Sequence, residues 1–219
     1  GQGGLRENAG PPSSSQTAAA RAAAAYAMNN KLITLALCLG SSGWALAAAP
    51  LLTPAALAPL LKQADVRVID IRDPKGFAAG HVAGAVNAPY GLWRGPATNP
   101  GELPGQDKLV ALVQKLGLTP ATHAVVISSG ADATDFGAMA RVYWTLKSLG
   151  LTELSIVNGG MQAWDAAKLP TSTAPVQVSP SSYAPTFDAR WLATREDVQQ
   201  HVKLSNAVLV DSRPDAFYQ

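Results

Sequence analysis

Cysteine and histidine are scarce in this 219-residue sequence. The one cysteine, Cys38, excludes an internal disulfide framework and any metal site built from several cysteines. The three histidines stand at positions 81, 123 and 201, too far apart in the sequence to form a metal-binding motif. Nothing in the sequence therefore indicates a metal or any other cofactor, and we expect none.

Charge is also scarce, since only 15% of the residues are charged and the formal net charge is +2. The 17 basic residues are scattered, and no window combines clustered Lys and Arg with aromatic residues. This excludes an electrostatic case for nucleic acid as a partner. The apolar share of 47% is enough for a sizeable core and argues against wholesale disorder.

The first 27 residues are low in complexity. They begin with glycine rather than methionine, are rich in Gly, Ser, Pro and Ala, and show no convincing amphipathic pattern. We interpret residues 1–27 as translated sequence upstream of the true start, in preference to a functional tail.

Residues 28–47 have the layout of a secretory signal peptide. Lys31 provides the short positive region, residues 32–39 form an apolar run, and residues 45–47 give an Ala-Leu-Ala cleavage site. An uncleaved membrane anchor is the alternative, but Ser and Gly residues at 41–43 interrupt the apolar stretch. We therefore expect a periplasmic or secreted protein with no membrane contact after cleavage.

One short stretch organises the rest of the sequence. The apolar run Val66–Ile69 ends on Asp70 and Arg72, which predicts a short buried strand with a charged exit. Pro74 then starts a brief helix, and a glycine turn leads to a second short strand at 85–88. This order predicts a parallel α/β sheet, in which ligands bind beyond the carboxyl ends of the strands, where Asp70 and Arg72 would lie.

The remaining pattern alternates helices and strands. A helix is expected to start at Pro54, with Thr53 as its N-cap. Further helices are expected at 108–116, 136–149 and 161–167, and strands at 124–127 and 155–157. Between them, residues 91–107 form a Gly/Pro-rich loop, and residues 168–188 have the Ser, Thr and Pro content of a linker.

Several separated motifs resemble those of the rhodanese family of sulfurtransferase-fold domains. They are Asp70-x-Arg72, Phe77 three residues before Gly80-His81, Val82-x-Gly84-Ala85, Arg141-Val-Tyr-Trp144 and the run from Ser155 to Trp164 with its Gly-Gly pair. One position departs, because Ala83 stands where the family commonly has proline. The resemblance implies an α/β rhodanese-like fold, a parallel sheet flanked by helices, in a first domain at residues 50–169.

The sequence also contains an internal repeat. Asp211-Ser212-Arg213 repeats Asp70-Ile71-Arg72 at an offset of 141 residues, and Thr194 matches Thr53 at the same offset. The apolar run Ala207–Val210 is the expected strand of this second copy. We therefore predict a linker at residues 170–186 and the truncated start of a second rhodanese domain at 187–219.

The resemblance implies sulfurtransferase chemistry located in the second copy. Members of this type take sulfane sulfur from thiosulfate or 3-mercaptopyruvate onto a loop cysteine and pass it to cyanide or a thiol acceptor. In the first copy, Ser129 occupies the position of that cysteine, and an oxygen atom cannot form a persulfide. The nucleophilic cysteine is then expected roughly 50 residues beyond Gln219, and the first copy alone is expected to be inactive.

The candidate site residues have two interpretations. Asp70, Arg72, Arg141, Asp211 and Arg213 are placed either to bind an anion or to fix loops, and for Asp70 and Arg72 we favour the loop-fixing role.

Two further interpretations concern the substrate and the function class. Phe217 stands where mercaptopyruvate-type members commonly have arginine, ahead of the aromatic Tyr218, which favours thiosulfate as the donor. The alternative function is an inert rhodanese-like module for anion binding or docking. A phosphatase on the same fold would need a His-Cys-x5-Arg motif, which the sequence does not contain.

Overall fold

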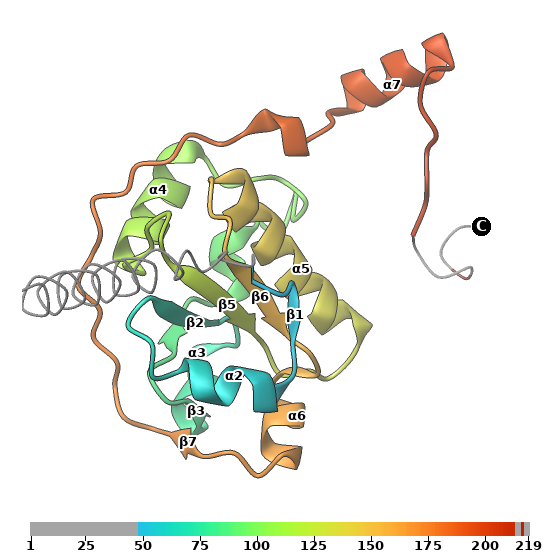
Figure 1. The fold of residues 1–219 in the computed structure, drawn as a ribbon. Coiled ribbons are helices and arrows are strands. Elements are labelled where there is room, and N and C mark those ends of the chain that lie inside the picture. The colour runs from blue at the N-terminus through green and yellow to red at the C-terminus, as the bar shows by residue number, and fades with distance from the viewer. Residues whose placement is uncertain (1–47, 213–215, 217–219) are drawn as a thin grey trace, which may run out of the picture. The chain divides into compact units, whose positions relative to one another are not determined.

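The computed structural model describes residues 48–212 and Ala216 (Figure 1). The predicted signal peptide at 28–47 and the candidate residue Arg213 lie outside the described residues. Within the described part of the chain, no helix combines the length and the apolar character needed to cross a membrane.

The centre of the domain is a five-stranded sheet in which every paired strand runs parallel to its neighbour. In spatial order the strands are β1 (Leu51–Leu52), β6 (Leu154–Val157), β5 (His123–Ile127), β2 (Val66–Asp70) and β4 (Val86–Asn87). The sequence predicted the parallel arrangement and four of these strands, and the structure confirms them. The two-residue β1 was missed, because so short a strand carries no periodic pattern.

Helices cover both faces of this sheet (Figure 1). The helices are α2 (Pro54–Leu60), α3 (Pro74–Ala79), α4 (Gln106–Lys115), α5 (Ala133–Ser148) and α6 (Gly160–Ala166), with a 3-10 helix at Tyr90–Trp93. Helices α4 and α5 pack on the face that carries Ile69 and Val126, whereas α2 and α6 pack on the face that carries Val68 and Val125. Adjacent strand residues thus point to opposite faces, both covered by helices, which is why most residues of these strands are apolar.

The helix starts follow local capping signals. Thr53 caps α2 as predicted, since its hydroxyl accepts a hydrogen bond from the Ala56 amide at 3.2 Å. The start of α5 was placed three residues too late, at Phe136 instead of Ala133. The reason is Asp132, whose carboxylate caps the helix by accepting from the Asp135 amide at 2.9 Å.

The segment predicted as a linker packs along the first domain. Strand β7 (Thr171–Ser172) pairs antiparallel with β3 (His81–Val82), and Tyr183 donates its hydroxyl hydrogen to the Leu149 carbonyl at 2.7 Å. Val176 and Val178 contact the core beside α4. The segment therefore packs on the surface of the domain that contains the five-stranded sheet.

The last described residues include a helix without tertiary burial. Helix α7 (Arg195–Leu204) begins with a capping box between Thr194 and Asp197, and none of its residues is buried. The strand expected at Ala207–Val210 is wrong for this structure, because these residues form no strand and Val208 is 89% exposed. A strand requires a neighbour to pair with, and the described part of the chain pairs none with this run.

Candidate functional site

Asp70 and Arg72 form a buried ion pair at the carboxyl end of β2. The Asp70 side chain is fully buried, and its carboxylate accepts hydrogen bonds from Arg72 Nε at 3.0 Å and Nη2 at 2.6 Å. Arg72 Nη2 also donates to the Gly80 carbonyl at 2.7 Å. The pair thus ties the end of β2 to the turn before β3, as the loop-fixing interpretation of these two residues requires.

Two neighbouring side chains complete this junction. Asn87 Nδ2 donates to the backbone carbonyls of Asp70 at 3.0 Å and Arg72 at 2.9 Å, which joins β4 to the same turn. His81 is buried, stacks on the Phe77 ring at 3.8 Å and lies with Nδ1 2.9 Å from the Phe77 carbonyl. Since a carbonyl only accepts, Nδ1 carries the hydrogen, and the imidazole serves to anchor the turn.

Residues 128–131 form the loop after β5, which we call the serine loop, and it contains the predicted Ser129. Ser128 and Ser129 donate their hydroxyl hydrogens to the two oxygens of Asp135, at 2.5 and 2.9 Å. The backbone amides of Gly130 and Ala131 donate to the same carboxylate. Four donors of one loop therefore converge on a single internal anion.

The charge of Asp135 is stabilised by these contacts. Burial of the carboxyl raises its pKa, but the hydrogen bonds from Ser128, Gly130, Ser129 and Ala131 together outweigh burial and lower the pKa of Asp135 below its usual range. Sequence reasoning missed this residue. The available signal was an acidic residue in the first turn of a helix, three residues after a capping aspartate.

The carbonyl groups of the same loop are also occupied. Met161 and Gln162, at the start of α6, donate their amide hydrogens to the carbonyls of Ser128 at 2.8 Å and Ser129 at 2.9 Å. Gly130 has a φ of +80°, and a Cβ there would overlap the carbonyl oxygen of Gly159. The Gly-Gly turn of the sequence motif is therefore needed for close backbone contact with the serine loop.

An open hollow of about 690 Å³ lies beside this loop. Its lining includes Ser129, Thr134 and Asp135, together with Tyr90 and Arg94 from the segment after β4. The Arg94 guanidinium lies 5.2 Å from the centre of the Tyr90 ring. The hollow is thus lined by the Arg94 guanidinium and by the Asp135 carboxylate, which is bonded to the loop.

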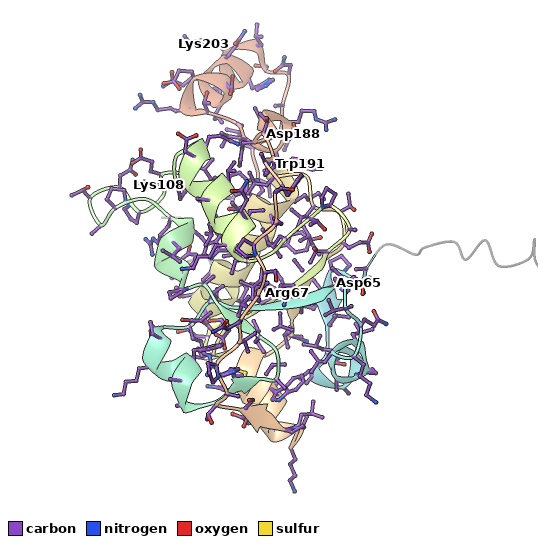
Figure 2. All side chains as sticks on the ribbon, turned by 90° about the vertical axis from the view of Figure 1, so that its left-hand side faces the viewer. Asp65, Arg67, Lys108, Asp188, Trp191 and Lys203 are labelled. Carbon is purple, nitrogen blue, oxygen red and sulfur yellow. The ribbon has the colours of Figure 1, made fainter. Side chains whose placement is uncertain are left out.

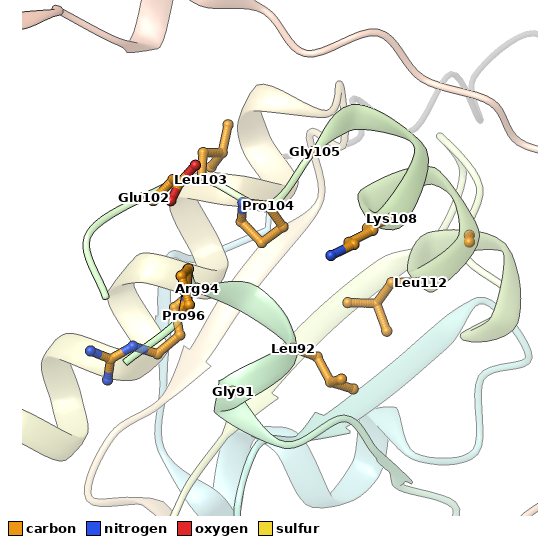
Figure 3. Close-up of a pocket in the computed structure, with 12 residues that line it drawn as sticks. Gly91, Leu92, Arg94, Pro96, Glu102, Leu103, Pro104, Gly105, Lys108 and Leu112 are labelled. Carbon is orange, nitrogen blue, oxygen red and sulfur yellow. The ribbon is translucent and has the colours of Figure 1, made fainter. Parts of the chain in front are cut away.

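A second hollow, of about 720 Å³, lies between the 3-10 helix and α4 (Figure 3). In Figure 3 the Lys108 ammonium points into this space beside Leu92 and Leu112, whereas the Arg94 guanidinium is directed away from it. None of the predicted candidate residues lines this hollow.

The remaining candidates do not join the serine loop. Arg141, on α5, donates from Nη2 to the Gly101 carbonyl at 3.0 Å and lies over the Trp144 ring at 4.9 Å. It therefore holds the Gly/Pro-rich loop and does not contact Ser129. Asp211 is exposed, and no group of side chains suited to a metal ion occurs among the described residues.

Helix α5 also holds the start of the segment that leads to α7. Trp144 Nε1 donates to the carbonyl of Trp191, which is labelled in Figure 2, at 2.7 Å. The Lys147 ammonium lies 4.3 Å from the centre of the Trp191 ring. Phe187 meets the Trp144 ring edge-on at 5.6 Å. These contacts fix residues 187–191 on α5.

Comparison with known proteins agrees with this geometry. The profile of the Rhodanese-like domain matches residues 53–167. The 3-mercaptopyruvate sulfurtransferase of Homo sapiens is 30% identical over 113 residues, which cover 51% of this chain and 37% of that protein. The putative thiosulfate sulfurtransferase of Synechococcus elongatus is 30% identical over 171 residues, which cover 75% of this chain and 51% of that protein. This chain therefore spans about half or less of the length of these relatives.

Solved structures show the same fold. SseA from Escherichia coli, described as a 3-mercaptopyruvate sulfotransferase with the rhodanese fold, superposes with a TM-score of 0.65 at 21% identity, over 77% of this chain and 67% of that one. The matched family profile covers more than half of the residues and includes every element of the parallel sheet except β1. The chain belongs to the rhodanese family.

Proposed function

We propose that this chain is part of an exported sulfurtransferase with two rhodanese domains, in which the first copy is non-catalytic. The persulfide-forming cysteine would lie in a second copy that starts near residue 187. Thiosulfate is the favoured sulfur donor, 3-mercaptopyruvate the second candidate, and cyanide or a thiol the acceptor. The sulfurtransferase relatives support the general activity, and their greater length supports a further domain.

The serine loop is the observation that carries this proposal. Its hydroxyl at residue 129 cannot be converted to a persulfide, and the amides of Gly130 and Ala131 are bonded to Asp135. A sulfurtransferase loop instead needs free amides to stabilise a thiolate and its persulfide. Sulfur transfer within this protein therefore needs a second loop.

The segment after residue 187 supports a second copy. A threonine-capped helix followed by an apolar run repeats the order of α2 and β2, and this run is exposed. Exposed apolar residues such as Val208 and Val210 are expected where a sheet would cover them.

The proposed reaction has two balanced steps. The cysteine thiolate attacks the sulfane sulfur of thiosulfate, the bond between Cys sulfur and sulfane sulfur forms, and sulfite leaves with the electron pair of the broken S–S bond. Cyanide then attacks the terminal sulfur, thiocyanate departs, and the electron pair of the broken bond regenerates the thiolate.

The test compares this chain with the product of the extended reading frame. We expect no thiocyanate from thiosulfate and cyanide with the 219-residue chain, and turnover with the extended protein if it contains a Cys-x-x-Gly loop. Replacement of that cysteine by serine provides the matched control and should abolish turnover. Turnover by the 219-residue chain alone, or an extended frame without any such cysteine, would contradict the proposal and leave the inert docking or anion-binding module.

Export has its own test. Residues 28–47 are proposed to be removed as a signal peptide, so N-terminal sequencing of the mature protein should begin near Ala48. A mature protein that retains Lys31 and stays with the membrane fraction would favour the uncleaved anchor.

A further inference from the structure

Four donors of the serine loop, residues 128–131, point to Asp135. Its two hydroxyls and the amides of Gly130 and Ala131 all bond to one carboxylate. Its carbonyls at 128 and 129 accept from the first turn of α6. Groups of the same domain thus occupy both hydroxyls, the amides of residues 130 and 131 and the carbonyls of residues 128 and 129.

We propose that Asp135 is a built-in anion that keeps this loop closed to external anions and to thiolate chemistry. The inference rests on the proposed function, in which the first copy is inert. Ser129 is then one of two causes of this inactivity. The Asp135 carboxylate is the second cause, because it already occupies the position where the loop would stabilise a thiolate or a bound anion.

The geometry makes Asp135 a strong competitor. Its backbone amide is held by the N-cap carboxylate of Asp132, and its carboxylate is held by the hydroxyls of Ser128 and Ser129. It lies within the same chain, so it binds the loop without the loss of translational and rotational freedom that a dissolved anion undergoes. The hydrogen bonds that it accepts also lower its pKa, and it stays charged near neutral pH.

Asp132 provides a matched control. It is acidic, exposed and three residues away, but it bonds to the Asp135 amide and not to the loop amides. If any negative charge near the start of α5 raised the pKa of a thiol at position 129, D132N and D135N would lower that pKa alike. If occupation of the loop raises the pKa of a thiol at position 129, only D135N will lower it, because the side-chain oxygen that D132N keeps can still accept from the Asp135 amide.

The first experiment introduces a thiol and measures its pKa. In the 219-residue chain with C38S, which removes the only other thiol, S129C is compared with S129C/D135A, S129C/D135N and S129C/D132N. The pH dependence of alkylation by iodoacetamide gives the thiol pKa of each. We expect S129C/D135A to have a pKa lower by about one unit, which means roughly tenfold more thiolate at neutral pH, while S129C/D132N matches S129C.

The second experiment asks whether the emptied loop accepts an anion. With Ser129 in place, sulfate and then thiosulfate are titrated into wild type, D132N and D135A, and the amide resonances of Gly130 and Ala131 are followed by NMR. We expect saturable shifts of these two amides in D135A alone. Equal shifts in the wild type, or none in D135A, would overturn the proposal.

The proposal can still be refuted if D135A does not fold. If D135A is unfolded by circular dichroism, S129C/D135N decides, because the amide keeps the size of the side chain and removes its charge. A thiol pKa equal to that of S129C would then refute the role of Asp135. Both experiments use only this chain, so their failure leaves the predicted second copy untouched, and a second copy without cysteine would leave the role of Asp135 standing.

Discussion

Arg72 gives the sharpest test of what stabilises the fold. We predict that R72M, which keeps most of the side-chain length but removes the guanidinium, strongly destabilises the protein. The Asp70 carboxylate is fully buried, and R72M would leave it only the Arg72 backbone amide, at 3.0 Å, among its present partners. The substitution also removes the donor that holds the Gly80 carbonyl.

The magnitude follows from burial. Removing one partner of a buried ion pair costs about 3–5 kcal/mol, since the remaining charge is desolvated without compensation. With a urea m-value of about 2 kcal/mol per molar, the unfolding midpoint should fall by about 2 M. D70N/R72M should recover part of this loss, because a neutral amide replaces the stranded carboxylate.

The assay is equilibrium urea unfolding followed by the fluorescence of Trp93 and Trp164, both of which are buried. A matched control is R190M, since Arg190 binds Asp188 with the same spacing and an Nη2 to Oδ2 distance of 2.6 Å, but its side chain is 85% exposed. Its midpoint should hardly move. Equal losses for R72M and R190M would refute the claim that burial decides the contribution of the pair.

Three further predictions concern stability and local order. T53A should destabilise the protein by about 1 kcal/mol, and T53S should restore it, because the N-cap acceptor of α2 is lost and regained. Burial lowers the pKa of His123 from 6.5, so the unfolded chain takes up the proton more readily and stability should fall as the pH drops below about 6.5; H123Q should show less of this fall, and an equal fall would contradict it. W144F, which removes the donor to the Trp191 carbonyl, should speed tryptic cleavage at residues 190–195, and an unchanged rate would show that this bond does not hold the segment.

The sequence predicted the sheet and its helices well because their signals are local. The strands β2, β5 and β6 are short and mostly apolar, and the threonine and proline at 53 and 54 form a strong helix start. Helix boundaries were less accurate where the cap lay inside a loop, as with Asp132. Residues that form a cap and residues that precede it look alike until the backbone conformation is known.

The Asp135 contact could not be predicted because it depends on tertiary closure. The loop that holds it packs closely against Gly159, which lies 29 positions after Gly130 in the sequence. The packing of the 170–186 segment was missed for a related reason. Its Ser, Thr and Pro content is that of a linker, while isolated residues such as Val178 and Tyr183 make the contacts.

The Asp-x-Arg motif shows how far a repeated spacing can support a duplicated domain. The pairs at 70–72 and 188–190 have nearly the same geometry, because in both the aspartate accepts from the backbone amide two residues later where the chain turns. The same spacing at Asp65 and Arg67 lies where the chain enters β2 and forms no ion pair among the described residues (Figure 2).

The motif therefore reports a local turn, and its presence at 211–213 would alone say little about a second domain. What distinguishes 211–213 from 188–190 is the order of the elements before it. A threonine-capped helix and an apolar run precede 70–72 and 211–213, but neither precedes 188–190. The apolar run at 207–210 is exposed and forms no strand in the described structure. The case for a second copy thus depends on finding the capped helix, the apolar run and the Asp-x-Arg motif in this order. An extended chain in which the apolar run stayed exposed would remove that case.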